Sequence, residues 1–266
     1  MSPRASAHRG DSSVFRENTL PAVRSAIAKG ADIVEIDVRL TADGEVVVLH
    51  DATLARLWDD PRPIAEVPTA DLAAFGGPDD RPPLLTEVLA LFAGPNASTA
   101  TSRLVIDMDD ARFAAPAHAV VAASGVVVDW CGDLDGMRVL RSLDAEARIW
   151  LPWRALRVPT AAELAGLHPV TVNVPFPIAD DAFVRGVHDL GLPVTVWTLD
   201  EPDDLARAFA LGVDTITTNR LDRLQAMIAA DRATVADPAP TPASTPNSTP
   251  TTTPISTPIS TPEGHR

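Results

Sequence analysis

The sequence lacks the features of several specialised classes of protein. It contains one cysteine, Cys131, which excludes an internal disulfide and a cysteine-based zinc cluster. No apolar run approaches the ~20 residues that a transmembrane helix needs. The opening residues MSPRASAHRG contain no apolar signal-peptide core. We therefore expect a cytoplasmic protein that does not insert stably into a membrane.

Positive charge is also scarce. The chain has 36 Asp and Glu against 22 Lys and Arg, a formal net charge of −14 and a pI of about 4.7. A broad nucleic-acid surface needs clustered Lys and Arg, so we do not expect nucleic acid as a partner. With 266 residues, of which 45% are hydrophobic, the chain can bury the core of one large domain. The oligomeric state stays open.

The last part of the chain differs in composition from the rest. Beyond about Thr234 the sequence is a Ser/Thr/Pro repeat with few apolar residues. Such a segment cannot bury enough apolar surface to fold. We predict a folded domain over residues 1–231 and a disordered Ser/Thr/Pro-rich tail over residues 232–266.

Short apolar runs rich in β-branched residues alternate with stretches of helical periodicity along the folded domain. The first run ends at His8 and the second covers residues 32–38; six more lie at residues 104–108, 126–129, 147–151, 170–174, 193–197 and 213–217. Strands buried on both faces give such runs. Eight strands alternating with helices predict an α/β fold of the (β/α)8 TIM barrel type. In the helix expected over residues 200–211, Asp200 is the predicted N-cap.

A turn sequence interrupts this alternation after the second strand. Asp43-Gly44 separates the second strand from the apolar run 46–49. Asp-Gly is typical of a tight β-hairpin. The sequence therefore predicts a small hairpin insertion that returns His50 toward the second strand.

The second strand carries two carboxylates on one face. Glu35 and Asp37 stand at i and i+2 in the run VEIDV, and alternate residues of a strand point to the same side. Two like charges so close repel unless a cation lies between them, and carboxylate oxygens suit Ca²⁺ or Mg²⁺. His8 and Arg9 follow the first strand, and the Arg9 guanidinium suits phosphate oxygens. Together with His50, these groups predict phosphodiester cleavage.

The order of these motifs resembles a known family. His8-Arg9-Gly10 is followed by ENT at residues 17–19, by GADIVEIDVRLTADGEVVVLHD at residues 30–51 and by ATLAR. This series closely resembles the opening of the glycerophosphodiester phosphodiesterases. Residues 190–219 also resemble the last two strand and helix units of that family.

The resemblance implies metal-dependent hydrolysis of a small-molecule glycerophosphodiester to an alcohol and sn-glycerol 3-phosphate. The implied ligands of the Ca²⁺ or Mg²⁺ ion are three carboxylates: Glu35, Asp37 and Asp107. Negative charge grows on the phosphate during attack, so Arg9 is the predicted phosphate-binding residue. His8 and His50 are the predicted acid and base, and the sequence leaves open which is which.

The chain departs from the family pattern at the predicted mouth of the barrel. Asp109 stands where family members commonly have a lysine. Asp129-Trp130 stands where they often show Ser-Phe, and Thr218-Asn219 replaces Thr-Asp. Two acidic replacements at one mouth are expected to change the choice of substrate.

Tryptophans gather at or just beyond the predicted strand ends: Trp130, Trp150, Trp153 and Trp197. Aromatic faces beside extra carboxylates suit a quaternary ammonium group. We predict that Asp109, Trp130 and Trp197 belong to the substrate pocket. This composition favours a choline or ethanolamine headgroup.

Two other functions fit parts of the pattern. A phospholipase D of the sphingomyelinase D type shares this barrel and uses an aspartate where Asp107 stands, but it needs an apolar rim that is not evident in the sequence. A catalytically impaired barrel that only binds phosphodiesters would explain Asp109. The presence of both His8 and His50 argues against that interpretation.

Overall fold

A ring of parallel strands forms the centre of the molecule. The computed structural model describes residues 2–77, 79–93 and 102–236. Its strands are β1 (Arg4–Ala7), β2 (Ile33–Leu40), β3 (Val46–Val48), β4 (Arg103–Met108), β5 (Val128–Gly132), β6 (Arg148–Pro152), β7 (Thr171–Pro175), β8 (Val194–Trp197) and β9 (Thr215–Thr218). The strands pair in the order β1-β9-β8-β7-β6-β5-β4-β2-β3. Parallel pairing of β1 with β2 closes the barrel.

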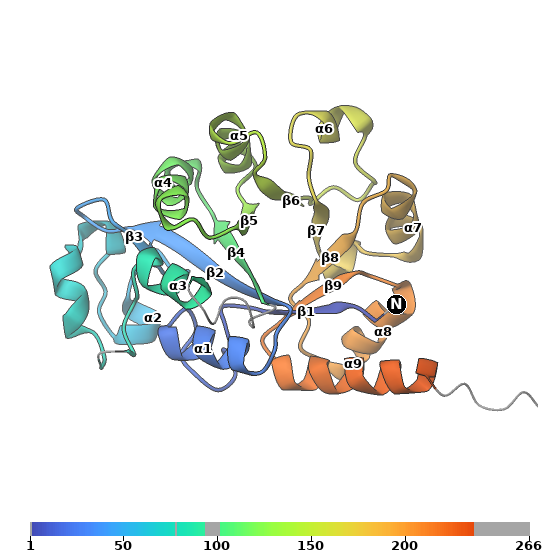
Figure 1. Cartoon of the computed structure of the whole chain (residues 1–266), viewed down its shortest axis with the longest axis horizontal. Helices are drawn as coiled ribbons and strands as arrows, with labels where there is room; N and C mark the ends of the chain where they lie inside the picture. Colours follow the sequence, from blue (N-terminus) through green and yellow to red (C-terminus); the bar gives the residue numbers. More distant parts are fainter. Residues whose placement is uncertain (1, 78, 94–101, 237–266) are drawn as a thin grey trace, which may run out of the picture.

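Helices surround this barrel, as Figure 1 shows. The α-helices are α1 (Leu20–Ala28), α2 (Ala55–Trp58), α3 (Leu85–Phe92), α4 (Ala114–Ser124), α5 (Leu134–Leu143), α6 (Ala161–Ala165), α7 (Asp181–Asp189), α8 (Pro202–Leu211) and α9 (Leu221–Ala236). Short 3-10 helices cover Ile64–Glu66, Thr69–Ala74, Ala111–Phe113 and Phe176–Ile178. The predicted (β/α)8 TIM barrel is confirmed. Within the described residues, no helix has both the length and the apolar character that crossing a bilayer requires.

The predicted hairpin is also present. β3 pairs antiparallel with β2, with Val38 opposite Val48 and Leu40 opposite Val46. The segment after β3 packs its own small hydrophobic cluster, which contains Val47, Leu49, Leu54, Ile64, Val67, Leu72 and Phe75. This insertion lies with α2 at one side of the barrel, on the left in Figure 1. Leu49, which follows β3, also donates from its backbone N–H to the backbone oxygen of Asp37 at 3.0 Å. The next residue, His50, is therefore held beside β2.

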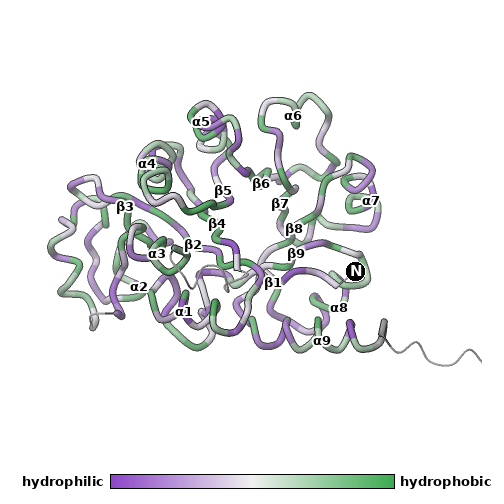
Figure 2. Tube along the Cα trace, in the orientation of Figure 1, coloured by the Kyte–Doolittle hydropathy of each residue, from purple (hydrophilic) through white to green (hydrophobic). Residues whose placement is uncertain are grey.

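Each barrel strand alternates between an outer face and an inner face. On β2, Val34, Ile36 and Val38 belong to the main core between strands and helices. A second cluster contains Ile33, Val105, Cys131 and Trp150, which come from four neighbouring strands of the ring and fill its interior. In Figure 2, most of β4 is coloured hydrophobic, whereas the surrounding helices alternate along their length. Residues of opposite parity on β2 therefore face the interior, Glu35 and Asp37 among them.

The register of β5 corrects one part of the sequence interpretation. The predicted strand ended at Asp129, but β5 continues to Gly132. This shift puts Trp130 on the outer face, where it is 2% exposed within the main core. Asp129 lies inside the barrel and pairs with Arg103 and Arg148, which stand at the starts of β4 and β6. Asp129 is therefore not an acidic replacement at the mouth.

Two boundaries also differ from the prediction. α8 begins at Pro202 with Glu201 at the N-cap position, so Asp200 is not the cap. α9 extends to Ala236, beyond the predicted domain end at residue 231. Residues 237–266, the rest of the predicted tail, lie outside the described residues.

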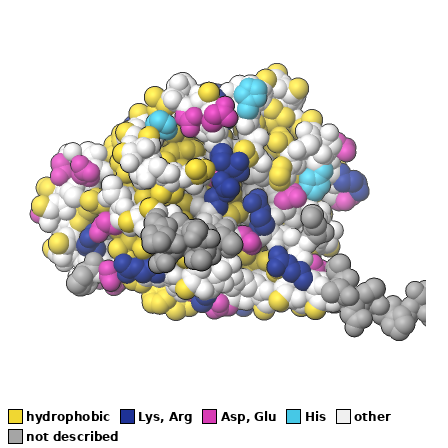
Figure 3. Space-filling view, viewed as in Figure 1, with side chains coloured by type: hydrophobic (Ala, Val, Ile, Leu, Met, Phe, Trp, Pro, Cys, Tyr) yellow, Lys and Arg dark blue, Asp and Glu magenta, His cyan; other side chains and the backbone are white. Residues whose placement is uncertain are grey.

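Figure 3 shows basic side chains gathered near the middle of the face seen in Figure 1, with acidic side chains scattered around them.

Candidate active site

A cavity of about 250 Å³ opens at the carboxyl ends of the barrel strands. This is the end at which TIM barrels carry their working residues. The cavity is lined by most of the predicted site residues: His8, Arg9, Glu35, Asp37, His50, Asp107, Asp109 and Trp197. Trp130 is not among the lining residues, because it faces the outer core. Trp150, Trp153 and Cys131 line the cavity instead.

The three predicted ligand carboxylates come from two adjacent strands. In the register of β2 with β4, Asp37 lies opposite Asp107. Burial and the charges of Asp37 and Asp107 raise the pKa of Glu35 well above its usual value. Burial and Asp37 raise the pKa of Asp107 to about 6. The cavity thus concentrates negative charge that the surrounding groups do not fully compensate.

Arg9 supplies part of the compensation. Its backbone N–H donates to Glu35 Oε2 at 2.9 Å, and its Nε lies 3.2 Å from Asp37 Oδ2. The backbone of Arg9 has a φ of +60°, which is unusual for a residue other than glycine. Gly10 allows the turn that follows, because a Cβ there would lie 2.6 Å from the backbone of Ala22 in α1. The chain thus aims both the amide and the guanidinium of Arg9 at the carboxylates.

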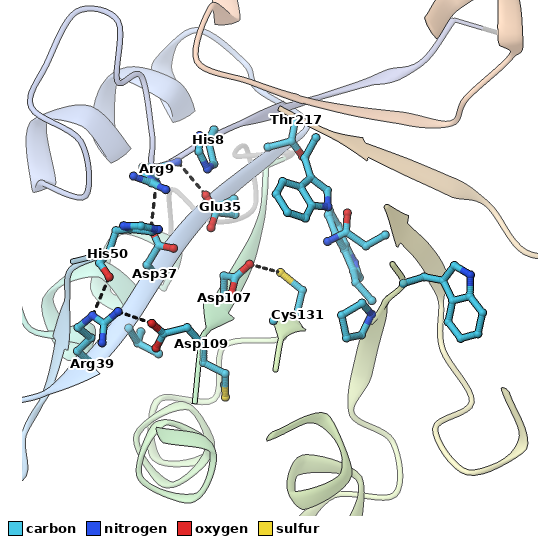
Figure 4. Close-up of a pocket in the computed structure, with 18 of the residues that line it drawn as sticks. His8, Arg9, Glu35, Asp37, Arg39, His50, Asp107, Asp109, Cys131 and Thr217 are labelled. Carbon is cyan, nitrogen blue, oxygen red and sulfur yellow. Dashed lines mark hydrogen bonds and ion pairs between the residues drawn. The ribbon is translucent and has the colours of Figure 1, made fainter. Parts of the chain in front are cut away.

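Further hydrogen bonds hold this arrangement. Asn18 donates from Nδ2 to Asp37 Oδ2 at 2.7 Å, and Arg9 donates from Nη1 to Glu17 Oε1 at 2.7 Å. Within the described residues, no three His, Cys, Asp or Glu side chains are yet arranged as a metal cage. The donor chemistry nevertheless fits a hard divalent cation, because the carboxylates of Glu35, Asp37 and Asp107 line the same cavity. Figure 4 shows Glu35 and Asp37 on the β2 side, with Asp107 next to Cys131.

His8 lies directly after β1, and its orientation is fixed by two residues near the end of β9 and the start of α8. His8 Nδ1 is 2.7 Å from Asn219 Oδ1. Asn219 donates from Nδ2 to Asp200 Oδ2 at 2.8 Å and from its backbone N–H to Asp200 Oδ1. Because the Asp200 carboxylate can only accept, the amide of Asn219 must present its oxygen to His8. His8 therefore carries its proton on Nδ1 and keeps Nε2 free.

The charge state of His8 is also set locally. Burial and Arg9 lower the pKa of His8, and the hydrogen bond with Asn219 and the carboxylates of Asp37 and Glu17 only partly offset them. The ring is therefore neutral at neutral pH. A neutral imidazole with a free Nε2 at the cavity is able to accept a proton.

His50 has a different partner. Its Nδ1 lies 2.7 Å from Asp51 Oδ1, and Asp51 also binds Arg56 through both carboxylate oxygens. Hydrogen bonds from Arg56 and His50 lower the pKa of Asp51 to about 2, so this side chain is a carboxylate. His50 is held in place by its backbone oxygen, which accepts from Arg39 Nε at 2.7 Å. A doubly protonated His50 ring would thus face a negative charge, whereas His8 faces a neutral amide.

Comparison with known proteins assigns the chain to a family. A sequence model of the glycerophosphoryl diester phosphodiesterase family matches residues 8–223. The chain is 30% identical over 249 residues to the probable glycerophosphodiester phosphodiesterase 2 of Mycobacterium tuberculosis. The alignment covers 85% of this chain and 90% of that protein. It is 28% identical over 236 residues to the glycerophosphodiester phosphodiesterase of Caldanaerobacter subterraneus subsp. tengcongensis, covering 80% and 92%. The chain belongs to the glycerophosphoryl diester phosphodiesterase family. It is therefore a phosphoric diester hydrolase.

Solved structures show the same fold. The putative glycerophosphoryl diester phosphodiesterase of Silicibacter pomeroyi superposes with a TM-score of 0.78 at 24% identity, covering 87% of this chain and 94% of that one. A phosphodiesterase of Oleispira antarctica, solved in complex with the product sn-glycerol-3-phosphate, superposes with a TM-score of 0.76 at 21% identity, covering 86% and 97%. At these identities the likeness establishes the barrel architecture of the glycerophosphoryl diester phosphodiesterases.

Asp109, which stands where family members commonly have a lysine, is paired with a buried arginine in this chain. Asp109 follows β4 and forms an ion pair with Arg39, which stands on β2 two residues after Asp37. The Arg39 side chain is only 10% exposed and lines the cavity. Sequence reasoning missed Arg39, although period-2 spacing from Glu35 and Asp37 already placed it on the same face. The carboxylate at Asp109 is thus matched by a buried guanidinium.

Asn219 and Asp200 were also missed as site residues. Asn219 was noted only as a departure from Thr-Asp, and Asp200 was assigned to the start of a helix. Both interpretations used local sequence, whereas the contacts join the loop after β8 to the loop after β9 and to His8. A signal was present, because Asp200 and Asn219 lie only three and two residues after the ends of predicted strands.

Proposed function

We propose that this chain hydrolyses glycerophosphodiesters to an alcohol and sn-glycerol 3-phosphate with the help of a divalent cation. The observation that carries the proposal is that two imidazoles, each with Nδ1 held by an acceptor, line the same cavity as three carboxylates from β2 and β4. The names of the relatives and the product bound in the Oleispira antarctica structure agree with this substrate class.

The three carboxylates of Glu35, Asp37 and Asp107 would hold the cation, and their oxygens fit Mg²⁺ or Ca²⁺. When bound, the cation supplies Lewis-acid stabilisation of the charge that grows on the phosphoryl oxygens. Arg9 adds a guanidinium at the same region, where its present contacts with Glu35 and Asp37 place it. The raised pKa values of Glu35 and Asp107 report the charge that such an ion would neutralise.

His8 is the general base in this proposal. Its Nδ1 proton is committed to Asn219, so Nε2 is the atom that accepts the proton of the attacking hydroxyl. After transfer the ring is positively charged and faces a neutral amide. The contacts of Asn219 with Asp200 and His8 keep the neutral ring in the tautomer with its proton on Nδ1.

His50 is the general acid. The leaving alkoxide must gain a proton, and the His50 ring donates it from Nε2 while Asp51 holds Nδ1. The Asp51 carboxylate accepts from Nδ1 and fixes the orientation of the ring. The two histidines therefore divide the work because one faces an amide and the other faces a carboxylate.

The test is product analysis by ³¹P NMR with purified protein, glycerophosphoglycerol or glycerophosphocholine as substrate, and Mg²⁺ or Ca²⁺ present. The proposal expects sn-glycerol 3-phosphate, no turnover after chelation with EDTA, and recovery when the cation is returned. His118→Gln, in α4 and outside the cavity, is the matched control and should leave turnover unchanged. Turnover that persists in EDTA would contradict the metal role. Release of a phosphate-containing headgroup with free glycerol would contradict the stated bond cleavage.

A second candidate is phospholipase D-type cleavage of a single-chain lipid. Exposed apolar side chains lie in the loops after β1 and β6, namely Val14 at 58%, Phe15 at 41% and Leu156 at 89% exposure. The strands β1 and β6 lie on opposite sides of the ring, so these side chains are not one continuous rim. Lysophosphatidylcholine added as a third substrate distinguishes the candidates: faster hydrolysis of this lipid than of glycerophosphocholine would favour the second.

A further inference from the structure

The proposed reaction involves no residue from the wall of the cavity opposite the carboxylates. The carboxylates and His8 come from β1, β2 and β4, whereas Trp150, Arg154, Asn173 and Trp197 come from β6, its following loop, β7 and β8. In the ring order, β7 and β8 are separated from β2 by several strands on either side. Figure 4 shows large aromatic side chains across the cavity from Glu35 and Asp37. This second wall would contact the part of a substrate that extends away from the scissile phosphate.

Guanidinium groups already cover the aromatic faces of this wall. Arg154 lies over the Trp197 ring at 5.1 Å from its centroid, and Arg157 lies over the Trp153 ring at 5.2 Å. The remaining tryptophan of the wall, Trp150, is 2% exposed and donates from Nε1 to a carboxylate inside the barrel. A quaternary ammonium needs an open aromatic face, and a second cation over the same ring would repel it. The structure therefore does not support the predicted preference for choline.

The charge of Arg154 is available to a ligand. Among the described residues, no Asp or Glu forms an ion pair with it, whereas the nearby Arg157 binds Glu163 through two nitrogens. The Arg154 side chain is exposed at the cavity and its guanidinium is held in place by stacking on Trp197. A guanidinium that is oriented but not neutralised is suited to bind a carboxylate or a phosphate.

Two buried polar atoms of the same wall lack a partner. They are the Oδ1 acceptor of Asn173, whose residue is 9% exposed, and the Nε1 donor of Trp197. Buried polar groups are normally hydrogen-bonded, so unpartnered atoms on residues that line a cavity indicate a ligand that supplies the missing bonds. One acceptor and one donor together suit hydroxyl groups, which both donate and accept.

We propose that the preferred substrate carries hydroxyl groups and a second negative charge on its alcohol half, and that Arg154 binds this charge. The inference rests on the proposed function, because it names the alcohol that the hydrolysis would release. The glycerol half of a glycerophosphodiester has no charge of its own, so the second anion belongs to the alcohol. The ligand class is therefore a phosphorylated or carboxylated polyol joined to glycerol 3-phosphate.

A matched pair of substrates tests the inference. Glycerophosphoinositol and glycerophosphoinositol 4-phosphate differ by one phosphate group, and glycerophosphocholine supplies the cationic alternative. We expect kcat/KM for glycerophosphoinositol 4-phosphate to exceed the other two by about tenfold or more, since a charge-assisted contact to phosphate contributes about 1.5–3 kcal/mol. Arg154→Gln should remove this advantage through KM and leave glycerophosphoinositol within about twofold of its original rate. Arg138→Gln, on α5 and outside the cavity, removes the same charge and is the control that should change neither substrate.

The outcomes separate this inference from the proposed function. Equal kcat/KM for both inositol substrates in the unmodified protein would overturn the inference and leave the hydrolase intact. An equal loss on all three substrates in Arg154→Gln would also overturn it, because Arg154 would then act on the scissile phosphate. Calorimetric binding of the same three ligands is measured in parallel. Absence of any turnover, with binding of the 4-phosphate that depends on Arg154, would contradict the hydrolase and support the anion site.

Discussion

The amide of Asn219 is the group that orients His8, and its own orientation depends on Asp200. If Asp200 presented an amide nitrogen at the position of Oδ2, Asn219 would turn its oxygen toward that nitrogen. The Nδ2 group of Asn219 would then face His8 Nδ1, which would have to become an acceptor. His8 would carry its proton on Nε2 and could no longer act as a base. A single oxygen outside the cavity thus determines the tautomer of a residue inside it.

Asp200→Asn therefore tests the positioning role of this carboxylate. We expect kcat to fall by about 10² or more, by analogy with the loss that a wrong histidine tautomer causes in catalytic triads, with KM little changed. Asp203→Asn, in the first turn of α8, is the matched control for charge and should keep full activity. Steady-state kinetics and thermal unfolding are the measurements. An unchanged kcat in a folded Asp200→Asn protein would contradict the role.

The pH dependence of the reaction follows from the pKa of His8. A general base acts when it is neutral, and His8 is neutral above its pKa. Burial and Arg9 lower the pKa of His8 below its ordinary value of 6.5, against smaller opposing effects of Asn219, Asp37 and Glu17. The acidic limb of log kcat/KM, measured at saturating cation at every pH, should therefore have its midpoint below pH 6.5. A midpoint above that value would show that another group limits the reaction or that His8 is not the base.

At the scale of elements, the close contact between β4 and β5 positions Asp107. Gly132 ends β5 with φ +112°, and a Cβ there would lie 2.0 Å from Met108 O and 2.5 Å from Asp107 Oδ1. These atoms belong to the strand that presents the third carboxylate. Any side chain at Gly132 must therefore push the end of β4 away from its position.

Gly132→Ala should reduce kcat/KM by about tenfold or more, and overpacking should lower the free energy of unfolding by about 1–3 kcal/mol. Gly125→Ala is a matched control, since Gly125 also has positive φ but a Cβ there meets nothing within 4 Å. We expect the control to lose about 1–2 kcal/mol of stability through its backbone conformation and to keep its activity. Urea unfolding and initial rates distinguish them. Equal activity in both variants would mean that the position of Asp107 is not critical.

Elements were easier to predict than their registers. The eight barrel strands and the hairpin followed from apolar runs and from Asp43-Gly44, because periodicity and turn chemistry are local properties. The end of β5 did not, since VVVDWCG offers no turn residue before Gly132 and the strand boundary depends on pairing with β4. A shift of the strand end changed Trp130 from a predicted pocket residue to a core residue. Similarly, the role of Asp200 depends on a contact with Asn219 that no local pattern contains.

At the scale of the whole molecule, the cation is a ligand of the folded state alone. The carboxylates of Glu35, Asp37 and Asp107 lie on two strands that are far apart in an unfolded chain. A ligand that binds only the native state stabilises it, by about 2.7 kcal/mol at a concentration of 100 Kd. The site and the stability of the barrel are therefore coupled.

Mg²⁺ or Ca²⁺ should raise Tm by several degrees relative to NaCl of equal ionic strength. The double variant Glu35→Gln, Asp37→Asn should lose this increase, because it removes two of the three ligands. Asp203→Asn, Asp204→Asn removes the same charge from the surface of α8 and serves as the control, in which the increase should persist. Differential scanning calorimetry is the measurement. The same increase in all three proteins would show that the cation acts on the surface and not in the cavity.

The division of work between the two histidines is the central claim, and the choice of leaving group tests it most directly. An alkyl alkoxide needs a proton to leave, whereas p-nitrophenolate does not. Initial rates are compared for glycerophosphoglycerol and glycerophospho-p-nitrophenol in the unmodified protein, His8→Ala and His50→Ala. We predict that His50→Ala loses about 10²-fold or more on the alkyl substrate and recovers most of its rate on the p-nitrophenyl substrate, while His8→Ala loses activity on both. Recovery in His8→Ala instead of His50→Ala would contradict the assignment, and full activity in both variants would contradict the site itself.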